Sequence, residues 1–170
     1  AAAKGVIYLD APISGGPEGA ANGTLAIMVG GGESTFKKVL PVLNAMGSCI
    51  ELMGPTGTGT ATKLVNQLLV GAHAAAACEA LQLGKQLGLT DLDKLLDVLG
   101  NSWGQSKILL RCGRLIADSE KKADPSTLEV SGAPLRNLVK DLDFVGLAVA
   151  GAGINTPVVT TVQKQFAAAI

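Results

Sequence analysis

The sequence changes character at Gly54, and this change constrains the fold more than any other feature. Before Gly54, short apolar strand patterns alternate with glycine-rich turns around one amphipathic pattern: strands over 6–9, 24–29 and 49–53, and a helix over 34–47. After it, the sequence is patterned almost entirely for helices. We therefore expect a mainly α chain, with a small β-β-α-β block over residues 1–54 and an all-helical domain over residues 55–170.

The longest helical pattern covers residues 60–87 and is apolar on nearly all sides, so we expect it at the centre of the helical domain. Polar residues interrupt its most apolar stretch, which favours a buried helix of a soluble protein over a membrane span: Asn66, Gln67, His73, Glu79 and Gln82. Amphipathic patterns predict further helices over 90–100 and 103–115, from Pro134 onward and over 155–168, with a polar loop over 120–132.

The charge and cysteine content exclude several kinds of partner. The chain has 14 basic and 14 acidic residues, which gives it no general attraction to nucleic acid or to an anionic membrane. Its three cysteines show no C-x-x-C spacing and only one histidine could join them, so we expect neither a metal site nor a disulfide framework. Free cysteines fit a reducing compartment, the cytoplasm or the mitochondrion.

The stretch GPTGTGTATKLVNQ, which begins at Gly54, has the glycines of a phosphate-binding loop but not its lysine. A Walker loop requires lysine directly after its last glycine, where this chain has Thr60, and Lys63 comes three residues later. A dinucleotide-binding loop requires a small residue where this chain has Thr62. The sequence therefore predicts neither phosphate-binding motif.

Lys63, Asn66 and Gln67 remain as the chemically distinctive residues of that stretch. Their spacing of three and four places them on one face of a helix. A lysine on an apolar helix is costly to desolvate, so it loses its charge more readily and can exchange protons near neutral pH. A lysine that extends to water, beside a structural amide, accounts for the same pattern equally well.

A second distinctive stretch is DAPISGGPEGAANGT, residues 10–24. Ser14, Gly15 and Gly16 offer successive backbone amides and a hydroxyl that together can bind a carboxylate. The residues alone fit an ordinary turn between strands at least as well. Ser14 has no histidine near it in sequence, so a hydrolase triad is a poor interpretation.

Together these stretches resemble the signatures of the β-hydroxyacid dehydrogenase family. DAPISGGPEGAANGTLAIMVGG is similar to its substrate-binding signature, and GPTGTGTATKLVNQ to its catalytic signature, G-x-x-G-x-G-x-x-x-K-x-x-N. Lys140, Asp141 and Leu142 are similar to its K-D-L element. The three motifs occur in the order and with the separations typical of that family, over nearly the whole chain. The nearest group is that of 3-hydroxyisobutyrate dehydrogenase and tartronate semialdehyde reductase.

The resemblance implies a role for each matching residue in NAD- or NADP-dependent hydride transfer on a small β-hydroxy acid or its semialdehyde. Lys63 is implied as the general acid and base, Ser14, Gly15 and Gly16 as the binders of the substrate carboxylate, Asn66 as the partner of the reacting oxygen, and Lys140 as a residue near the cofactor. Gln67 is also implied at the substrate, where the family usually has a second asparagine, which is expected to change substrate choice.

The resemblance also implies the domain organisation. Residues 1–54 would be the C-terminal edge of a nucleotide-binding Rossmann domain, and residues 55–170 a helical domain like the C-terminal domain of 6-phosphogluconate dehydrogenase. No G-x-G-x-x-G motif follows a first strand, so we expect the C-terminal part of an enzyme that is inactive without its Rossmann domain. We also expect a homodimer or homotetramer through the helical domain.

The alternative is a non-catalytic helical oligomerisation module that kept these motifs for packing. The intact set of Lys63, Asn66 and Ser14 argues against it, because a decayed site has no chemical need for all three. We expect Asp141 and Asp143 to do no more than solvate their helix.

Overall fold

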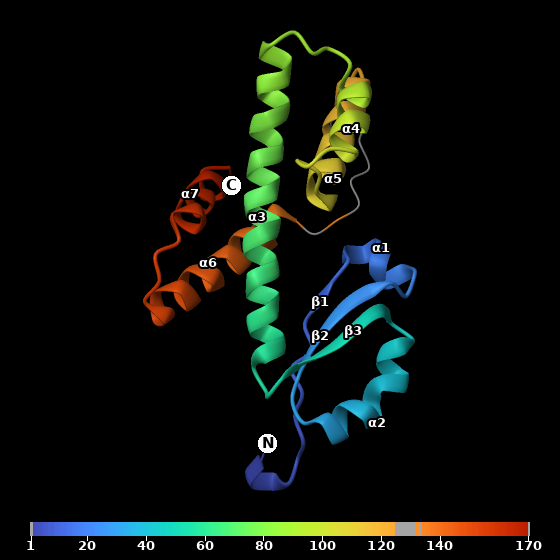
Figure 1. The fold of residues 1–170 in the computed structure, drawn as a ribbon, viewed down its shortest axis with the longest axis vertical. Helices are drawn as coiled ribbons and strands as arrows, with labels where there is room; N and C mark the ends of the chain where they lie inside the picture. The colour runs from blue at the N-terminus through green and yellow to red at the C-terminus, as the bar shows by residue number, and fades with distance from the viewer. Residues whose placement is uncertain (1, 125–131, 133, 170) are drawn as a thin grey trace. The chain divides into compact units, whose positions relative to one another are not determined.

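The structure is a computed structural model that describes residues 2–124, 132 and 134–169 (Figure 1). The chain divides into two compact units. The first comprises residues 1–67 and 131–145, and the second comprises residues 68–130 and 146–170. The mainly helical architecture with a small sheet at the start confirms the expected fold class.

The first unit contains a three-stranded sheet in the order β1-β2-β3. Its strands are β1 (Ile13–Ser14), β2 (Leu25–Gly30) and β3 (Gly47–Gly54). The short β1 is antiparallel to β2, and β2 is parallel to β3. A short 3₁₀ helix, η1 (Ala2–Lys4), begins the chain. The helix α1 (Gly16–Ala21) follows β1, and α2 (Glu33–Asn44) connects β2 to β3 and packs against β3.

The core of this unit lies on β2. Its alternate residues Leu25, Ile27 and Val29 are buried, and Phe36 and Leu43 of α2 pack against them. The strand expected over residues 6–9 is not formed: Val6 to Tyr8 are exposed, Leu9 packs against the core on β2, and the next residue, Asp10, forms an isolated bridge with Gly30. The apolar, β-branched pattern was present, but a strand also needs a neighbour to pair with.

The longest helix, α3 (Thr58–Gln86), contributes to both units. By length and composition it would also suit a membrane span, a property that core helices of soluble proteins share. Only 28% of its most apolar window is buried, and Val65, Leu69 and Leu83 are exposed. The helix is thus less enclosed in this chain than its composition predicts.

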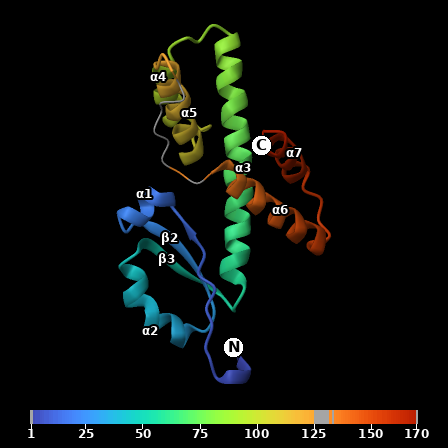
Figure 2. The same cartoon turned by 180° about the vertical axis from the view of Figure 1, so that it is seen from behind.

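The second unit contains helices α4 (Leu92–Gly100), α5 (Lys107–Glu120) and α7 (Pro157–Ala167), together with parts of α3 and of α6 (Leu135–Ala152). Helices α4 and α5 lie side by side (Figure 2), and their core joins Leu92, Leu96 and Ala117 to Leu81 of α3. The helix caps differ from those expected. Asp91, not Thr90, caps α4, and Ser106 caps α5, which therefore begins later than residue 103. Most of the loop expected over residues 120–132 lies outside the described residues.

Candidate active site

The N-terminus of α3 is held by a carboxylate that is distant in sequence. Asp10 accepts hydrogen bonds from the backbone amides of Gly57 at 2.6 Å and Thr60 at 2.7 Å, and from the Thr60 hydroxyl at 2.9 Å. Burial raises the pKa of Asp10, but these hydrogen bonds outweigh it and lower the pKa below its ordinary value. Asp10 therefore acts as an N-terminal cap for α3.

The glycines of GPTGTGTATKLVNQ serve this junction. A Cβ atom on Gly59 would lie 2.8 Å from the carbonyl oxygen of Asp10, 2.9 Å from the amide of Gly30, and closer still to the carbonyl oxygen of Met28. The first turn of α3 can therefore approach β2 only if this residue is glycine. Gly54 and Gly57 have positive φ angles, as required by the tight connection from β3 to α3. The glycines of this stretch are therefore required by the tight turn and by the close packing of α3 on β2.

Lys63 lies one turn further along α3 and reaches the segment that contains Ser14. Its Nζ donates a hydrogen bond to the carbonyl oxygen of Ile13 at 2.8 Å. The side chain is half-buried, and this burial is the main cause that lowers the pKa of Lys63. The negative charge of Asp141 raises that pKa and the positive charge of Lys140 lowers it, with a net shift below the ordinary value.

The two remaining residues on this face of α3 belong to a hydrogen-bonded chain. Asn66 Nδ2 donates to Gln67 Oε1 at 2.9 Å, and Gln67 Nε2 donates to Asp141 Oδ2 at 2.6 Å. The other oxygen of Asp141 lies 3.0 Å from Lys140 Nζ. The structure therefore brings the residues after GPTGTGT together with the K-D-L element of α6.

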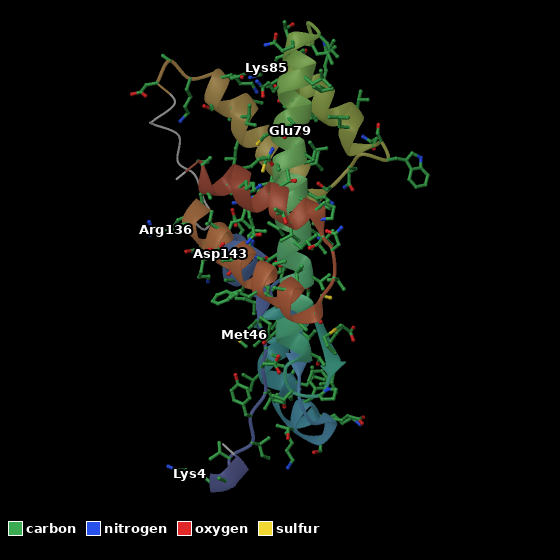
Figure 3. All side chains as sticks on the ribbon, turned by 90° about the vertical axis from the view of Figure 1, so that its left-hand side faces the viewer. Lys4, Met46, Glu79, Lys85, Arg136 and Asp143 are labelled. Carbon is green, nitrogen blue, oxygen red and sulfur yellow. The ribbon has the colours of Figure 1, made fainter. Side chains whose placement is uncertain are left out.

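Asp141 corrects an expectation drawn from the sequence. It does not merely solvate its helix, because it is partly buried and bonded to both Gln67 and Lys140. Asp143, two residues further along α6 (Figure 3), is exposed as expected. The contact of Asp141 joins residues 74 positions apart, so no local pattern could have revealed it.

Two family models match consecutive parts of the chain. Residues 57–170 match the model described as NAD-binding of NADP-dependent 3-hydroxyisobutyrate dehydrogenase. Residues 1–54 match the model of the NAD binding domain of 6-phosphogluconate dehydrogenase. The chain belongs to the β-hydroxyacid dehydrogenase family. This membership confirms the resemblance seen in the three motifs, and the family's cofactor is NAD or NADP.

Individual proteins match between about three fifths and nearly all of this chain. An uncharacterized oxidoreductase of Synechocystis sp. is 40% identical over 163 residues, which are 96% of this chain and 52% of that protein. The 2-(hydroxymethyl)glutarate dehydrogenase of Eubacterium barkeri is 48% identical over 106 residues, 62% of this chain and 35% of that protein. The crystal structure of a 3-hydroxyisobutyrate dehydrogenase from Salmonella typhimurium superposes with a TM-score of 0.83 at 31% identity, covering 99% of this chain and 56% of that one. The chain thus spans about half the length of the Synechocystis and Salmonella proteins.

Proposed function

We propose that this chain carries the substrate-binding and proton-transferring residues of an NAD(P)-dependent dehydrogenase of small β-hydroxy acids or their semialdehydes. The observation that carries the proposal is the hydrogen bond from Lys63 to the carbonyl oxygen of Ile13. It joins the lysine of one motif to the residue directly before Ser14, the start of the expected carboxylate-binding segment. Such a substrate requires a proton carrier close to an anion-binding segment, and Ile13 directly precedes that segment.

Lys63 is the proton carrier in this proposal. It takes the hydroxyl proton when the alcohol is oxidised and returns a proton when the carbonyl is reduced. Burial, which lowers the pKa of Lys63, increases the fraction of neutral amine available as a base at a given pH. The Ile13 carbonyl holds Nζ beside the segment that begins at Ser14.

Ser14, Gly15 and Gly16 bind the substrate carboxylate. Gly15 and Gly16 have φ angles of 137° and 64°, which allow this segment to turn sharply where α1 begins. Successive amides in such a turn, with the Ser14 hydroxyl, form a concave set of donors for an anion. Asn66 bonds the reacting oxygen, and Gln67 influences substrate choice from the adjacent position on α3.

Lys140 approaches the cofactor. Its side chain is 60% exposed, and its Nζ lies 3.0 Å from Asp141 Oδ1 and 6.0 Å from the centroid of the Phe144 ring. The ammonium group of Lys140 is paired with Asp141 but remains exposed, so it can also bind a polar group of a dinucleotide. When bound, NAD or NADP supplies the acceptor or donor of the hydride. The 170 residues contain no G-x-G-x-x-G loop of a Rossmann domain after a first strand, so we expect them to be inactive alone.

We further infer that the helical domain associates into a homodimer or homotetramer. Two of its helices carry exposed apolar side chains that support this association. Leu83 on α3 is 59% exposed, and Leu147 on α6 is 69% exposed. Sedimentation equilibrium distinguishes a monomer from an oligomer. We also infer a reducing compartment, since Cys49 and Cys78 are free and exposed. The alternative function, a non-catalytic oligomerisation module, predicts assembly without activity.

The test uses a fusion enzyme, in which this chain follows the part of the Salmonella typhimurium 3-hydroxyisobutyrate dehydrogenase that it does not match. Two acids named by the relatives described above, 3-hydroxyisobutyrate and 2-(hydroxymethyl)glutarate, are assayed with NAD and with NADP in a panel of small β-hydroxy acids. We expect turnover of at least one small β-hydroxy acid. Nucleotide binding by the fusion enzyme without oxidation of any acid in the panel would favour the non-catalytic module.

A further inference from the structure

Gln67 is a buried amide with a partner at each end. Its Oε1 accepts from Asn66, and its Nε2 donates to Asp141. Only 9% of the residue is exposed. A side chain so placed has little surface left for a ligand, so its main effect must pass through the two residues that it contacts.

The carboxylate of Asp141 determines which way both amides point. An ionised carboxylate only accepts hydrogen bonds, so Gln67 must turn its NH₂ group toward Asp141 and its carbonyl oxygen toward Asn66. Asn66 must then turn its own NH₂ group toward Gln67. The carbonyl oxygen of Asn66 is therefore directed to the opposite side of its amide, where it can accept a hydrogen bond from a ligand hydroxyl.

We propose that Asp141 is a positioning residue that acts through Gln67 to fix the orientation of the Asn66 amide on the face of α3 that carries Lys63. The same carboxylate holds Lys140 through its other oxygen. One charged group thus directs both an amide and an ammonium group. The catalytic consequence rests on the proposed function, whereas the orientation of the amides does not.

The test follows the side-chain NH₂ resonances of Asn66 and Gln67 by NMR in the 170-residue chain and in its Asp141→Asn variant. An asparagine side chain can present either a carbonyl or an NH₂ group, so it no longer imposes one orientation. We expect hydrogen exchange of the Gln67 NH₂ group to accelerate about tenfold or more, because a hydrogen bond to a charged group is lost. We also expect the Asn66 resonances to shift, although Asp141 bonds Gln67 and not Asn66.

Asp143→Asn is the matched control, since it removes the same charge from an exposed position on the same helix (Figure 3). It should change neither amide. A second variant, Gln67→Met, keeps a side chain of similar length and leaves Asp141 and Lys140 in place. It should also shift the Asn66 resonances, which tests the link from Gln67 to Asn66 separately from the link to Asp141.

Asn66 resonances that are the same in wild type and in Asp141→Asn would overturn the proposal, and so would a Gln67 NH₂ group that exchanges in wild type as fast as a free amide. Another result would distinguish a failure of the proposed function from a failure of the orientation proposal. If Asn66 responds as expected but Asn66→Ala leaves turnover of the fusion enzyme unchanged, Asp141 does orient the amide, and the role proposed for Asn66 in catalysis is wrong.

Discussion

The side-chain nitrogen of Lys63 donates a hydrogen bond to the main-chain carbonyl oxygen of Ile13, at 2.8 Å and across 50 residues of sequence. This contact unites the two motifs that the sequence singled out, because Ile13 directly precedes Ser14. Among the residues that the structure describes, no carboxylate forms an ion pair with the Lys63 nitrogen. Its protonation is therefore governed by burial and by the charges of α6.

The two charges on α6 should move the pKa of Lys63 in opposite directions. Asp141→Asn removes a negative charge that favours the ammonium form, so the pKa should fall further. Lys140→Met removes a positive charge that disfavours it, so the pKa should rise. Titration of the lysine Cε resonances by NMR measures both shifts in the 170-residue chain.

Asp143→Asn serves again as the matched control and should leave the pKa of Lys63 unchanged. A pKa of Lys63 that moves equally in Asp141→Asn and Asp143→Asn would contradict the account, since it would indicate a general effect of net charge and not a local one.

Asp10→Asn should destabilise the first unit by about 1–3 kcal/mol at neutral pH, because an amide cannot accept all of the hydrogen bonds that the carboxylate accepts. The folded-state pKa of Asp10 lies below its ordinary value of 3.8. Its stabilising effect is therefore complete above pH 3.8 and is lost as the pH falls through the folded-state pKa. Urea unfolding at pH 7 and in this acidic range measures the difference between variant and wild type.

Glu51→Gln is the control for that change, since Glu51 is an exposed carboxylate of the same unit. It should alter stability by less than about 0.5 kcal/mol. Two results would refute the capping role of Asp10. One is an equal free energy of unfolding for Asp10→Asn and wild type at pH 7, and the other is a difference between them that grows as the pH falls.

Gly59→Ala and Gly151→Ala should have opposite effects on stability, although both replace a glycine within a helix. At Gly59 a Cβ atom would collide with backbone atoms of β2 and Asp10, so we expect a loss of about 1–3 kcal/mol or more. At Gly151 no atom outside the helix's own turn lies within 4 Å, so alanine should stabilise by about 0.5–1 kcal/mol. Thermal unfolding of the two variants measures both. Equal effects would mean that α3 does not pack on β2 through Gly59.

The sequence predicted those features that depend on local pattern or on a motif. The helical character of the second part and the grouping of Lys63, Asn66 and Gln67 on one helix face follow from residue spacing. The domain boundary expected at Gly54 stays a prediction, and the two compact units of the structure divide the chain at other positions. The family resemblance implied roles for Lys63 and Ser14 at one substrate, but the contact of Lys63 with the residue before Ser14 was not predicted, because nothing in either stretch alone requires it.

The features that could not be predicted depend on tertiary contacts. Asp10 was taken as the end of a strand, and it instead caps a helix that begins 48 residues later. Asp141 was expected only to solvate its helix, as Asp143 was. The hydrogen bond from Gln67, a residue distant in sequence, distinguishes Asp141 from Asp143. The pattern over residues 6–9 suited a strand, but its pairing depends on neighbours that local pattern does not specify.

The most direct test of the central claim compares Lys63→Met with Lys38→Met in the fusion enzyme. Lys38 is an exposed lysine of α2 in the same unit, so it controls for the loss of one positive charge. We predict that Lys63→Met lowers kcat by about 100- to 10,000-fold, because general acid–base catalysis is lost, while Lys38→Met retains kcat and both variants keep the wild-type melting temperature within a few degrees. A Lys63→Met enzyme that folds and turns over within a few-fold of wild type would show that Lys63 is not the proton carrier.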